Sequence, residues 1–296
     1  MLNKLINKTE KANKDYYFDD SLIDFYEKSN EVEAFCNLFQ NKILHETTRF
    51  KNIKRWLDVG IGDGEKILKA LQTLNDGTEI DLTYLEPSDK WRLQFLSNGN
   101  CNNIKNIRKP PKNITVNLKG YNKTFEEYVN TNTTFDFDLI SFITVLYEPH
   151  LVNTLFEFIK NKRNNKNFWL LINIEHDNND FCKIRKILSQ SSFNPPISQL
   201  QNIESKLKEQ KIKYNKYDSD DKILNITPQE IINNKNHWLY PFLMGCSYKD
   251  YKTLYSENEQ NKIYKLVKQY LQKHYPMQNE NKIDINDTTI FAKIRK

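Results

Sequence analysis

The chain has 296 residues, enough for one large domain or for a main domain that carries a smaller one. Its composition, 38% hydrophobic and 12% aromatic, supports a buried core and excludes wholesale disorder. The net charge of +6 comes from 44 basic and 38 acidic residues. Because the basic residues are spread along the chain and do not gather in one segment, we expect no nucleic-acid partner.

Signals for export, membranes and metals are missing from the sequence. The first residues, MLNKLINKTEKANK, contain no continuous apolar stretch like that of a signal peptide, and no apolar run approaches the length that crosses a bilayer. The cysteines are far apart and form no CxxC pair, so we expect reduced thiols and no metal site; they are Cys36, Cys101, Cys182 and Cys246. We therefore expect a cytoplasmic protein with no membrane partner, and the oligomeric state stays open.

Apolar residues recur at helical spacing over residues 21–45, which predicts one or two amphipathic helices after a polar start. From residue 55 to residue 174, short apolar segments alternate with amphipathic ones. This alternation predicts a parallel sheet wound with helices on both faces, an α/β fold of the Rossmann-like kind. The expected strands are residues 55–59, 82–85, 113–118, 137–143 and 169–174, and the expected helices are residues 65–74, 89–96, a short one from 124, and 150–160.

The sequence pattern changes after residue 174, where the regular alternation of expected strands and helices stops. The segment 213–226 alternates like a strand, and residues 237–244 form an aromatic cluster. We expect helices at residues 181–188, 198–210 and 257–274 and a final strand at residues 289–294.

Three of the seven glycines, Gly60, Gly62 and Gly64, fall within five positions of the stretch WLDVGIGDGEKILKAL. A strand, a glycine turn and a helix form the first βα unit of a nucleotide-type fold, in which a ligand approaches the backbone near the helix N-terminus. An ordinary tight turn is the alternative explanation. The spacing differs from the dinucleotide fingerprint, and the lysine of a P-loop is missing. Glu86, 22 residues after Gly64, closes the next expected strand, where an acid can accept both ribose hydroxyls of an adenosine.

Asp58, Gly60, Gly62 and Glu86 together resemble the first motif and the following acidic position of class I S-adenosylmethionine-dependent methyltransferases. The expected strands also follow in the order that this family requires. The resemblance implies a class I methyltransferase sheet and S-adenosylmethionine as the cofactor. It places Gly60 beside the methionine end of the cofactor and Glu86 on the ribose.

The same resemblance implies further cofactor contacts. Trp91 and Phe125 fall where adenine-side contacts lie in the family, and Ile143 adds backbone or apolar contact. Helix-to-sheet packing explains Trp91 and Phe125 about equally well.

Methylation of a nucleic-acid base is disfavoured. Methyltransferases of DNA and of protein amides carry an [ND]-P-P-aromatic motif after the fourth strand, whose aromatic ring stacks on the target. Here residues 142–148 read FITVLYE. The chain does contain Asn194-Pro195-Pro196, but Ile197 follows it and it lies after the fifth strand, so we interpret it as a loop.

Several segments, in a shared order from about residue 18 onward, resemble histamine N-methyltransferase and its relatives. They read SLIDFYEKSNEVEAF, EPSDKWRLQFL, LISFITVLYE, IKYNKYDSDD, HWLYPFL and NDTTIFAKI. The resemblance implies that Glu31 holds the charged amine of the substrate and that Thr144, Tyr147 and Asp287 line the substrate pocket. It implies an aromatic lining made of Phe18, Phe181, Phe193 and Phe242.

The chain departs from the enzyme that acts on histamine at three of these positions. Thr144 replaces a glutamine, Glu148 replaces a tyrosine and Asp287 replaces an asparagine. If Glu31, Glu148 and Asp287 converge, three carboxylates need a cationic guest to stay ionised, which favours a substrate with more positive charge than histamine. Glu148 can also simply cap a helix or face solvent, and Asp287 can serve a turn.

The sequence therefore predicts an N-methyltransferase for a small cationic nitrogen compound, with Glu31, Thr144 and Asp287 as the catalytic group. Glu31 would grip a charged group away from the reacting nitrogen, and Thr144 or Asp287 would orient the nucleophile. The alternatives are an N-methyltransferase of an amino acid or peptide and a catalytically silent binding protein. The expected parts are an N-terminal helical cap (1–50), a cofactor-binding domain (51–180), an auxiliary substrate-binding region (181–260) and a C-terminal helix and strand that complete the main sheet (261–296).

Overall fold

The computed structural model describes residues 19–44, 53–75, 77–99, 114–132, 135–162, 167–219, 222–276 and 282–295. The chain forms two compact units. The sheet unit comprises Val32–Glu175, Gln199–Ser219 and Asp287–Lys296, and the helical unit comprises Met1–Glu31, His176–Ser198 and Asp220–Asn286. Residues 199–219, expected in the auxiliary region, therefore belong to the sheet unit, and the substrate-binding roles of the expected parts stay predictions.

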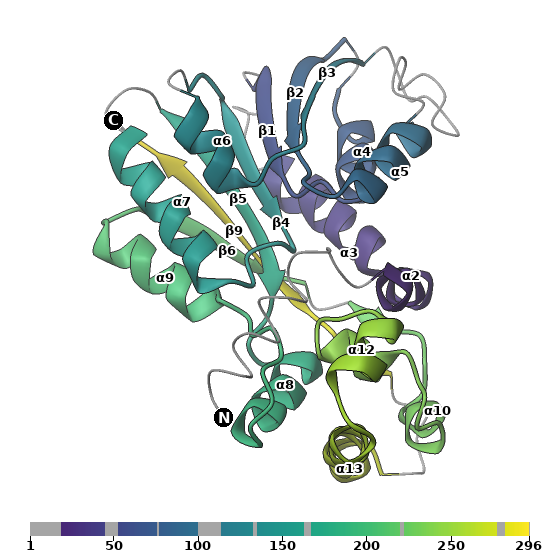
Figure 1. Ribbon diagram of the computed structural model, residues 1–296. Helices are drawn as coiled ribbons and strands as arrows, with labels where there is room; N and C mark the ends of the chain where they lie inside the picture. Colours follow the sequence, from purple (N-terminus) through teal and green to yellow (C-terminus); the bar gives the residue numbers. More distant parts are fainter. Residues whose placement is uncertain are drawn as a thin grey trace. The chain divides into compact units, whose positions relative to one another are not determined.

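The sheet unit is built on a seven-stranded sheet of order β3-β2-β1-β4-β5-β9-β6 (Figure 1). The first five strands in this order are parallel, and β9 runs antiparallel to both of its neighbours. The strands are β1 (Arg55–Val59), β2 (Glu79–Leu85), β3 (Thr115–Tyr121), β4 (Leu139–Ile143), β5 (Phe168–Glu175), β6 (Tyr214–Asp218) and β9 (Asp287–Ile294). The order 3-2-1-4-5 is that of the Rossmann fold, with its switch point between β1 and β4. The expected α/β, Rossmann-like fold is confirmed.

Helices cover both faces of this sheet (Figure 1). One face packs against α6 (Phe125–Thr131), α7 (Pro149–Lys162) and α9 (Leu200–Glu209). The other packs against α3 (Glu31–Leu38), the π-helix η1 (Phe39–Leu44), α4 (Glu65–Gln72) and α5 (Asp89–Gly99). Because parallel strands are covered on both sides, they read as continuous apolar runs, and all five residues of β4 are buried.

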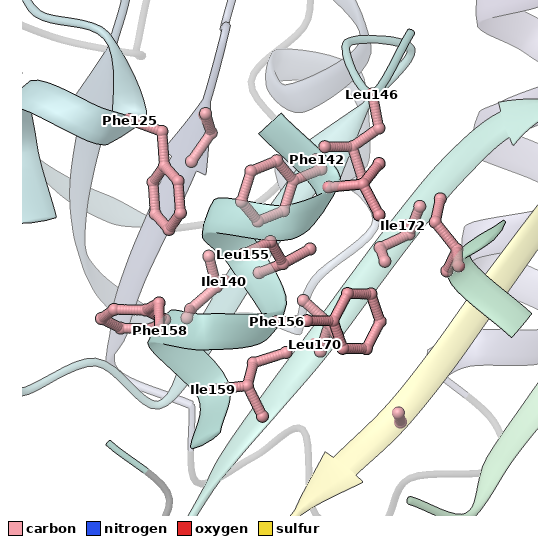
Figure 2. Packing of buried hydrophobic residues seen from close by; sticks show 14 of the residues in the cluster. Phe125, Ile140, Phe142, Leu146, Leu155, Phe156, Phe158, Ile159, Leu170 and Ile172 are labelled. Atoms are coloured by element: carbon pink, nitrogen blue, oxygen red, sulfur yellow. The ribbon is translucent and has the colours of Figure 1, made fainter. Parts of the chain in front are cut away.

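In the core on the α6–α7 side, phenylalanine rings pack among Leu and Ile side chains (Figure 2). Phe142 of β4 is fully buried, and the ring of Phe125 meets it edge-on with centroids 5.1 Å apart. Phe158 of α7 contacts Phe125 in the same manner at 5.6 Å. Edge-to-face pairs of this kind add stability beyond the buried area alone.

The helical unit has its own hydrophobic core. Its helices are α2 (Asp19–Lys28), α8 (Asp180–Gln190), α10 (Pro228–Asn233), α11 (Leu239–Leu243), α12 (Tyr248–Leu254) and α13 (Glu257–His274), and β7 (Ile223–Leu224) pairs with β8 (Ile283–Asp284). The strand-like alternation at residues 213–226 is therefore divided, because β6 joins the main sheet and β7 pairs inside the helical unit. Buried Asp180 accepts hydrogen bonds from the hydroxyls of Tyr270 and Tyr275 and from the backbone of Asp284, which joins α8, α13 and β8.

We predict that Phe142→Ala lowers the free energy of unfolding by about 3–5 kcal/mol, because it removes a fully buried ring and leaves a cavity between β4, α6 and α7. Urea denaturation measures the change. The matched control is Leu93→Ala on α5, whose side chain is 60% exposed, and which should change stability by less than about 0.5 kcal/mol. Equal effects of the two substitutions would contradict the packing described here.

Candidate functional site

The glycine turn between β1 and α4 has a left-handed backbone that explains its composition. Gly60, Gly62 and Gly64 have φ angles of 70°, 58° and 75°, a region that L-residues with a Cβ rarely adopt. A Cβ at Gly60 would lie 2.5 Å from Cγ1 of Val145, and one at Gly64 would overlap the ring of Phe95. A Cβ at Gly62 would meet nothing within 4 Å. The first and third glycines therefore permit close packing, and the second leaves space beside the backbone at the switch point.

Glu86 ties this turn to the end of β2. Its Oε2 accepts a hydrogen bond from the Gly62 amide at 2.9 Å, and its Oε1 accepts one from the Ser88 amide at 2.9 Å. The side chain is 6% exposed, and burial raises its pKa while the two amide bonds oppose that shift. A carboxylate has about four lone-pair sites, so Glu86 can still accept hydroxyl groups from a ligand.

Asp58, an expected cofactor contact, is buried on β1 and belongs to a polar chain between β1 and β4. The Ser141 hydroxyl donates to its Oδ1, and the Trp56 indole donates to Ser141 Oγ at 2.6 Å. Burial raises the pKa of Asp58 to about 7, and the Ser141 hydrogen bond opposes the shift. The Asp58 carboxyl group thus forms a hydrogen bond with the Ser141 hydroxyl, and contact of Asp58 with a cofactor stays a prediction.

The three expected apolar cofactor contacts have different surroundings. Phe125 is 2% exposed and packs inside the hydrophobic core on the α6–α7 side. Ile143 ends β4 and belongs to the cluster on the opposite face. Trp91 is buried on α5 but lies outside the three hydrophobic clusters formed by the described residues, with the Lys90 ammonium 5.8 Å from its ring centroid. Of the three, Trp91 is the least explained by core packing.

Thr144 follows β4 directly, at the other side of the switch point from Glu86. Its φ of 56° is unusual for a β-branched residue, and such backbone strain is concentrated at functional sites. Its hydroxyl donates to the Ile143 carbonyl at 2.8 Å and accepts from Lys66 Nζ at 3.1 Å. Lys66, on the first turn of α4, is only 8% exposed. Sequence reasoning missed Lys66, although its position two residues after the glycine turn was a usable signal.

Asp287 begins β9 and is 2% exposed. Its backbone amide donates to Ser219 Oγ at 2.9 Å. In the antiparallel register it stands directly opposite Glu175, the last residue of β5, which is 5% exposed. Opposed residues have Cβ atoms about 4.5–5.5 Å apart and share one face of the sheet. Glu175 is therefore a second buried acid at this position, which the sequence analysis did not identify.

Tyr147 and Glu148 lie in the loop between β4 and α7. Tyr147 is partly buried, whereas the side chain of Glu148 is exposed. The carbonyl of Glu148 accepts hydrogen bonds from the amides of Leu151 and Val152, so this residue opens α7. Glu148 therefore caps the helix through its backbone carbonyl, as one of the two alternatives expected. Contact of the Glu148 side chain with a substrate stays a prediction.

Glu31 belongs to the helical unit and is paired inside it. Residues Asn30 and Ile223 exchange two hydrogen bonds, at 3.3 Å and 2.8 Å, which align the segment before Glu31 with the segment after Lys222. Lys222 Nζ lies 3.3 Å from Glu31 Oε1, and both side chains are 3% exposed. The same ammonium is 5.9 Å from the ring centroid of Phe25. The chain itself thus supplies a cation to the carboxylate that the resemblance assigns to a substrate amine.

The expected aromatic lining divides into two groups within the helical unit. Phe181 and Phe242 pack on each other and on Phe25, with the Phe25 and Phe242 rings stacked at 4.6 Å. Phe193 instead contacts Tyr255, and Lys262 Nζ is 5.3 Å from its ring centroid. Phe18 lies outside the described residues. Contacts of these rings with a substrate stay predictions.

Other kinds of site find no support in the described residues. No group of three or more His, Cys, Asp or Glu side chains in this part of the chain could hold a metal ion. Burial lowers the pKa of His237 to about 4, which suits a neutral packing residue. No helix among the described residues is both long and apolar enough to cross a membrane.

Comparison with known proteins gives distant structural likeness only. No protein-family model and no curated protein matches the sequence. The plantazolicin methyltransferase BpumL, solved with SAH, is 13% identical with a TM-score of 0.48 over 99% of both chains. A cyclopropane-fatty-acyl-phospholipid synthase-like protein from Lactobacillus casei is 12% identical, with a TM-score of 0.49 over 87% of this chain and 91% of that chain. A SAM-dependent methyltransferase from Archaeoglobus fulgidus is 13% identical, with a TM-score of 0.40 over 87% and 94%. With scores this low, nothing about the ligand or activity of this chain follows from these structures.

We predict that Asp58→Asn changes how stability depends on pH. The folded protein keeps the Asp58 proton up to about pH 7, whereas an unperturbed aspartate loses it near 3.8. The carboxyl group therefore stabilises the fold at low pH, and this contribution is lost as the pH rises through 7. Urea denaturation from pH 4 to 8 should show wild type losing stability relative to Asp58→Asn as the pH rises.

The control for this prediction is Asp81→Asn, an exposed aspartate on β2. The stability difference between this variant and wild type should vary much less over the same range. A pH-independent difference for Asp58→Asn would show that the buried carboxyl group is ionised throughout.

Proposed function

We propose that this chain is an S-adenosylmethionine-dependent N-methyltransferase that acts on a small cationic nitrogen compound. The observation that carries the proposal is the hydrogen bond from the Gly62 amide to Glu86, which joins the loops after β1 and β2 beside the switch point. It joins the two features that adenosine recognition needs, an open glycine turn and an acid at the end of the second strand. The segments that resemble histamine N-methyltransferase relatives support the choice of nitrogen as the acceptor.

The residues at the switch point fit the cofactor. The space beside Gly62, into which a Cβ would project without contact, admits a ligand close to the backbone. Glu86 keeps lone pairs for the ribose hydroxyls, and Trp91 stands apart from the core clusters and can border the adenine. When bound, S-adenosylmethionine supplies a sulfonium methyl group that needs no further activation. The protein then has to align the acceptor nitrogen with this carbon, and alignment alone can contribute about 7–11 kcal/mol in favourable cases.

The acceptor nitrogen must be unprotonated to attack. A neighbouring carboxylate raises the pKa of an amine, so the group that holds the charged part of the substrate should act away from the reacting nitrogen. In the sheet unit, Thr144 can orient the nucleophile, and Asp287 can take the released proton. Asp287 stands opposite Glu175 in the sheet, so two buried acids lie side by side at this position.

The ion pair in the helical unit favours a second candidate, an amino acid or a peptide terminus. A substrate ammonium that uses Glu31 has to share this carboxylate with Lys222 or displace it, and an uncompensated buried charge is costly. A zwitterion avoids this cost, because its ammonium can face Glu31 while its carboxylate faces Lys222. The Lys222–Glu31 pair thus complements a zwitterion better than a simple cation.

We predict that the wild-type protein binds S-adenosylmethionine in a calorimetric titration and that Glu86→Gln weakens binding about tenfold or more, because charge-assisted hydrogen bonds to the ribose are lost. Glu79→Gln, at an exposed position of the same strand, is the matched control and should bind like wild type. No binding by the wild type would overturn the proposed function. Unchanged binding by Glu86→Gln would remove this residue from the ribose.

We predict methyl transfer from labelled S-adenosylmethionine to a small nitrogen compound, detected by mass spectrometry. Histamine and histidine form the central pair of the panel because they differ only by a carboxylate, and other biogenic amines and short peptides complete it. Preference for histamine supports the cationic substrate, and preference for histidine supports the zwitterion. Glu31→Gln should raise KM for the preferred substrate about tenfold or more while cofactor affinity stays unchanged.

The control for Glu31 is Glu27→Gln, at an exposed position of α2, which should leave KM unchanged. Equal loss of substrate and cofactor binding in Glu31→Gln would assign this residue a structural role. Cofactor binding without methylation of any compound in the panel would instead favour a catalytically silent binding protein.

A further inference from the structure

Lys66 places a buried positive charge at the switch point of the sheet. It lies on the first turn of α4, immediately after the glycine turn, and its side chain is 8% exposed. Its ammonium donates to Thr144 Oγ1 at 3.1 Å, in the loop that follows β4. The ammonium therefore stands at the carboxyl edge of the sheet, where ligands of doubly wound folds bind.

Asp58 is an acidic neighbour of Lys66. Asp58 interacts electrostatically with Lys66, but burial raises the pKa of this carboxyl group to about 7. An anion that approaches Thr144 comes close to the Lys66 ammonium, and the attraction between opposite charges is stronger in a poorly hydrated site than in water.

The order of the strands determines which end of a bound cofactor meets this charge. Glu86 follows β2, the glycine turn follows β1 and Thr144 follows β4, and these strands are consecutive in the sheet. Neighbouring strands are about 4.8 Å apart, so β2 and β4 are separated by roughly 10 Å. A cofactor whose ribose is held by Glu86 and which crosses the glycine turn presents its amino-acid end on the β4 side, beside Thr144 and Lys66.

We infer that Lys66 binds the carboxylate of the amino-acid end of S-adenosylmethionine. Thr144 holds the Lys66 ammonium in place by accepting its hydrogen bond. This inference rests on the proposed function. It adds a binding residue outside both the glycine turn and the acid of β2, and it gives the strained backbone of Thr144 a role in positioning the cofactor.

Calorimetric titration with two unreactive ligands tests this inference. The first is S-adenosylhomocysteine, and the second is decarboxylated S-adenosylhomocysteine, which differs only by the missing carboxylate. Lys66→Met should weaken binding of the first ligand about 10- to 100-fold. Binding of the second should stay within about twofold of wild type, or tighten because a like charge near its ammonium is removed.

Lys69→Met is the matched control, because Lys69 lies on the same helix, is 41% exposed and pairs with Glu65. It should bind both ligands like wild type. Thermal unfolding identifies any loss of folding, and Lys66→Gln provides a second variant if Lys66→Met is unstable. Because both ligands are compared within one variant, a general loss of folded protein cancels from the ratio.

Each other outcome overturns the inference in a recognisable way. Equal weakening of both ligands would mean that Lys66 only supports the fold of the turn. Unchanged affinity for S-adenosylhomocysteine would place its carboxylate elsewhere. Failure of the wild type to bind either ligand would overturn the proposed function, and the inference with it.

Discussion

The hydrogen bonds of Glu86 are the interaction on which the candidate site depends. One carboxylate, buried at the end of β2, accepts the amide of Gly62 from one loop and the amide of Ser88 from the next. A buried carboxylate is tolerated only where such bonds compensate its lost hydration, so each loop stabilises the position of the other. The bonds also hold the glycine turn in place. Val145 packs against Gly60 and Phe95 packs against Gly64, whereas a Cβ at Gly62 would meet no protein atom within 4 Å. The site is therefore largely formed before any ligand arrives.

Buried charges in both units are placed beside a partner of the chain itself. Lys66 contacts Thr144 and interacts with Asp58, and Lys222 pairs with Glu31. This arrangement follows from the cost of an isolated buried ion. Removing one partner of a buried ion pair lowers the stability of a protein by roughly 3–5 kcal/mol. A charged ligand group that enters such a site takes the place of the protein group that was paired with the buried ion. The ligand must therefore carry charges of the same sign as the groups it displaces, so a buried ion pair contributes to ligand selectivity as well as to stability.

Much of the fold, but less of the site, could be predicted from the sequence. The glycine triplet and the acid at the end of the next strand are local signals, and the alternation of strands with helices predicted the sheet. The contact of Lys66 with Thr144 spans 78 positions and depends on the pairing of β1 with β4. The Glu175–Asp287 pair depends on the antiparallel register of β5 and β9. Glu31 looked available for a substrate because the sequence gives no sign that Lys222 lies beside it.

The hydrogen bonds of Thr144 restrict the nitrogen that it can orient. Its hydroxyl proton is given to the Ile143 carbonyl, and one lone pair accepts from Lys66, so a single acceptor site remains. In the proposed reaction, a substrate N–H that donates to this site keeps the nitrogen lone pair free for the methyl group. In the same proposal the attacking nitrogen is unprotonated, so a cationic substrate would carry its charge on a second nitrogen, away from Thr144. The hydrogen bonds of Thr144 and the need for a free lone pair together favour a substrate with two different nitrogens.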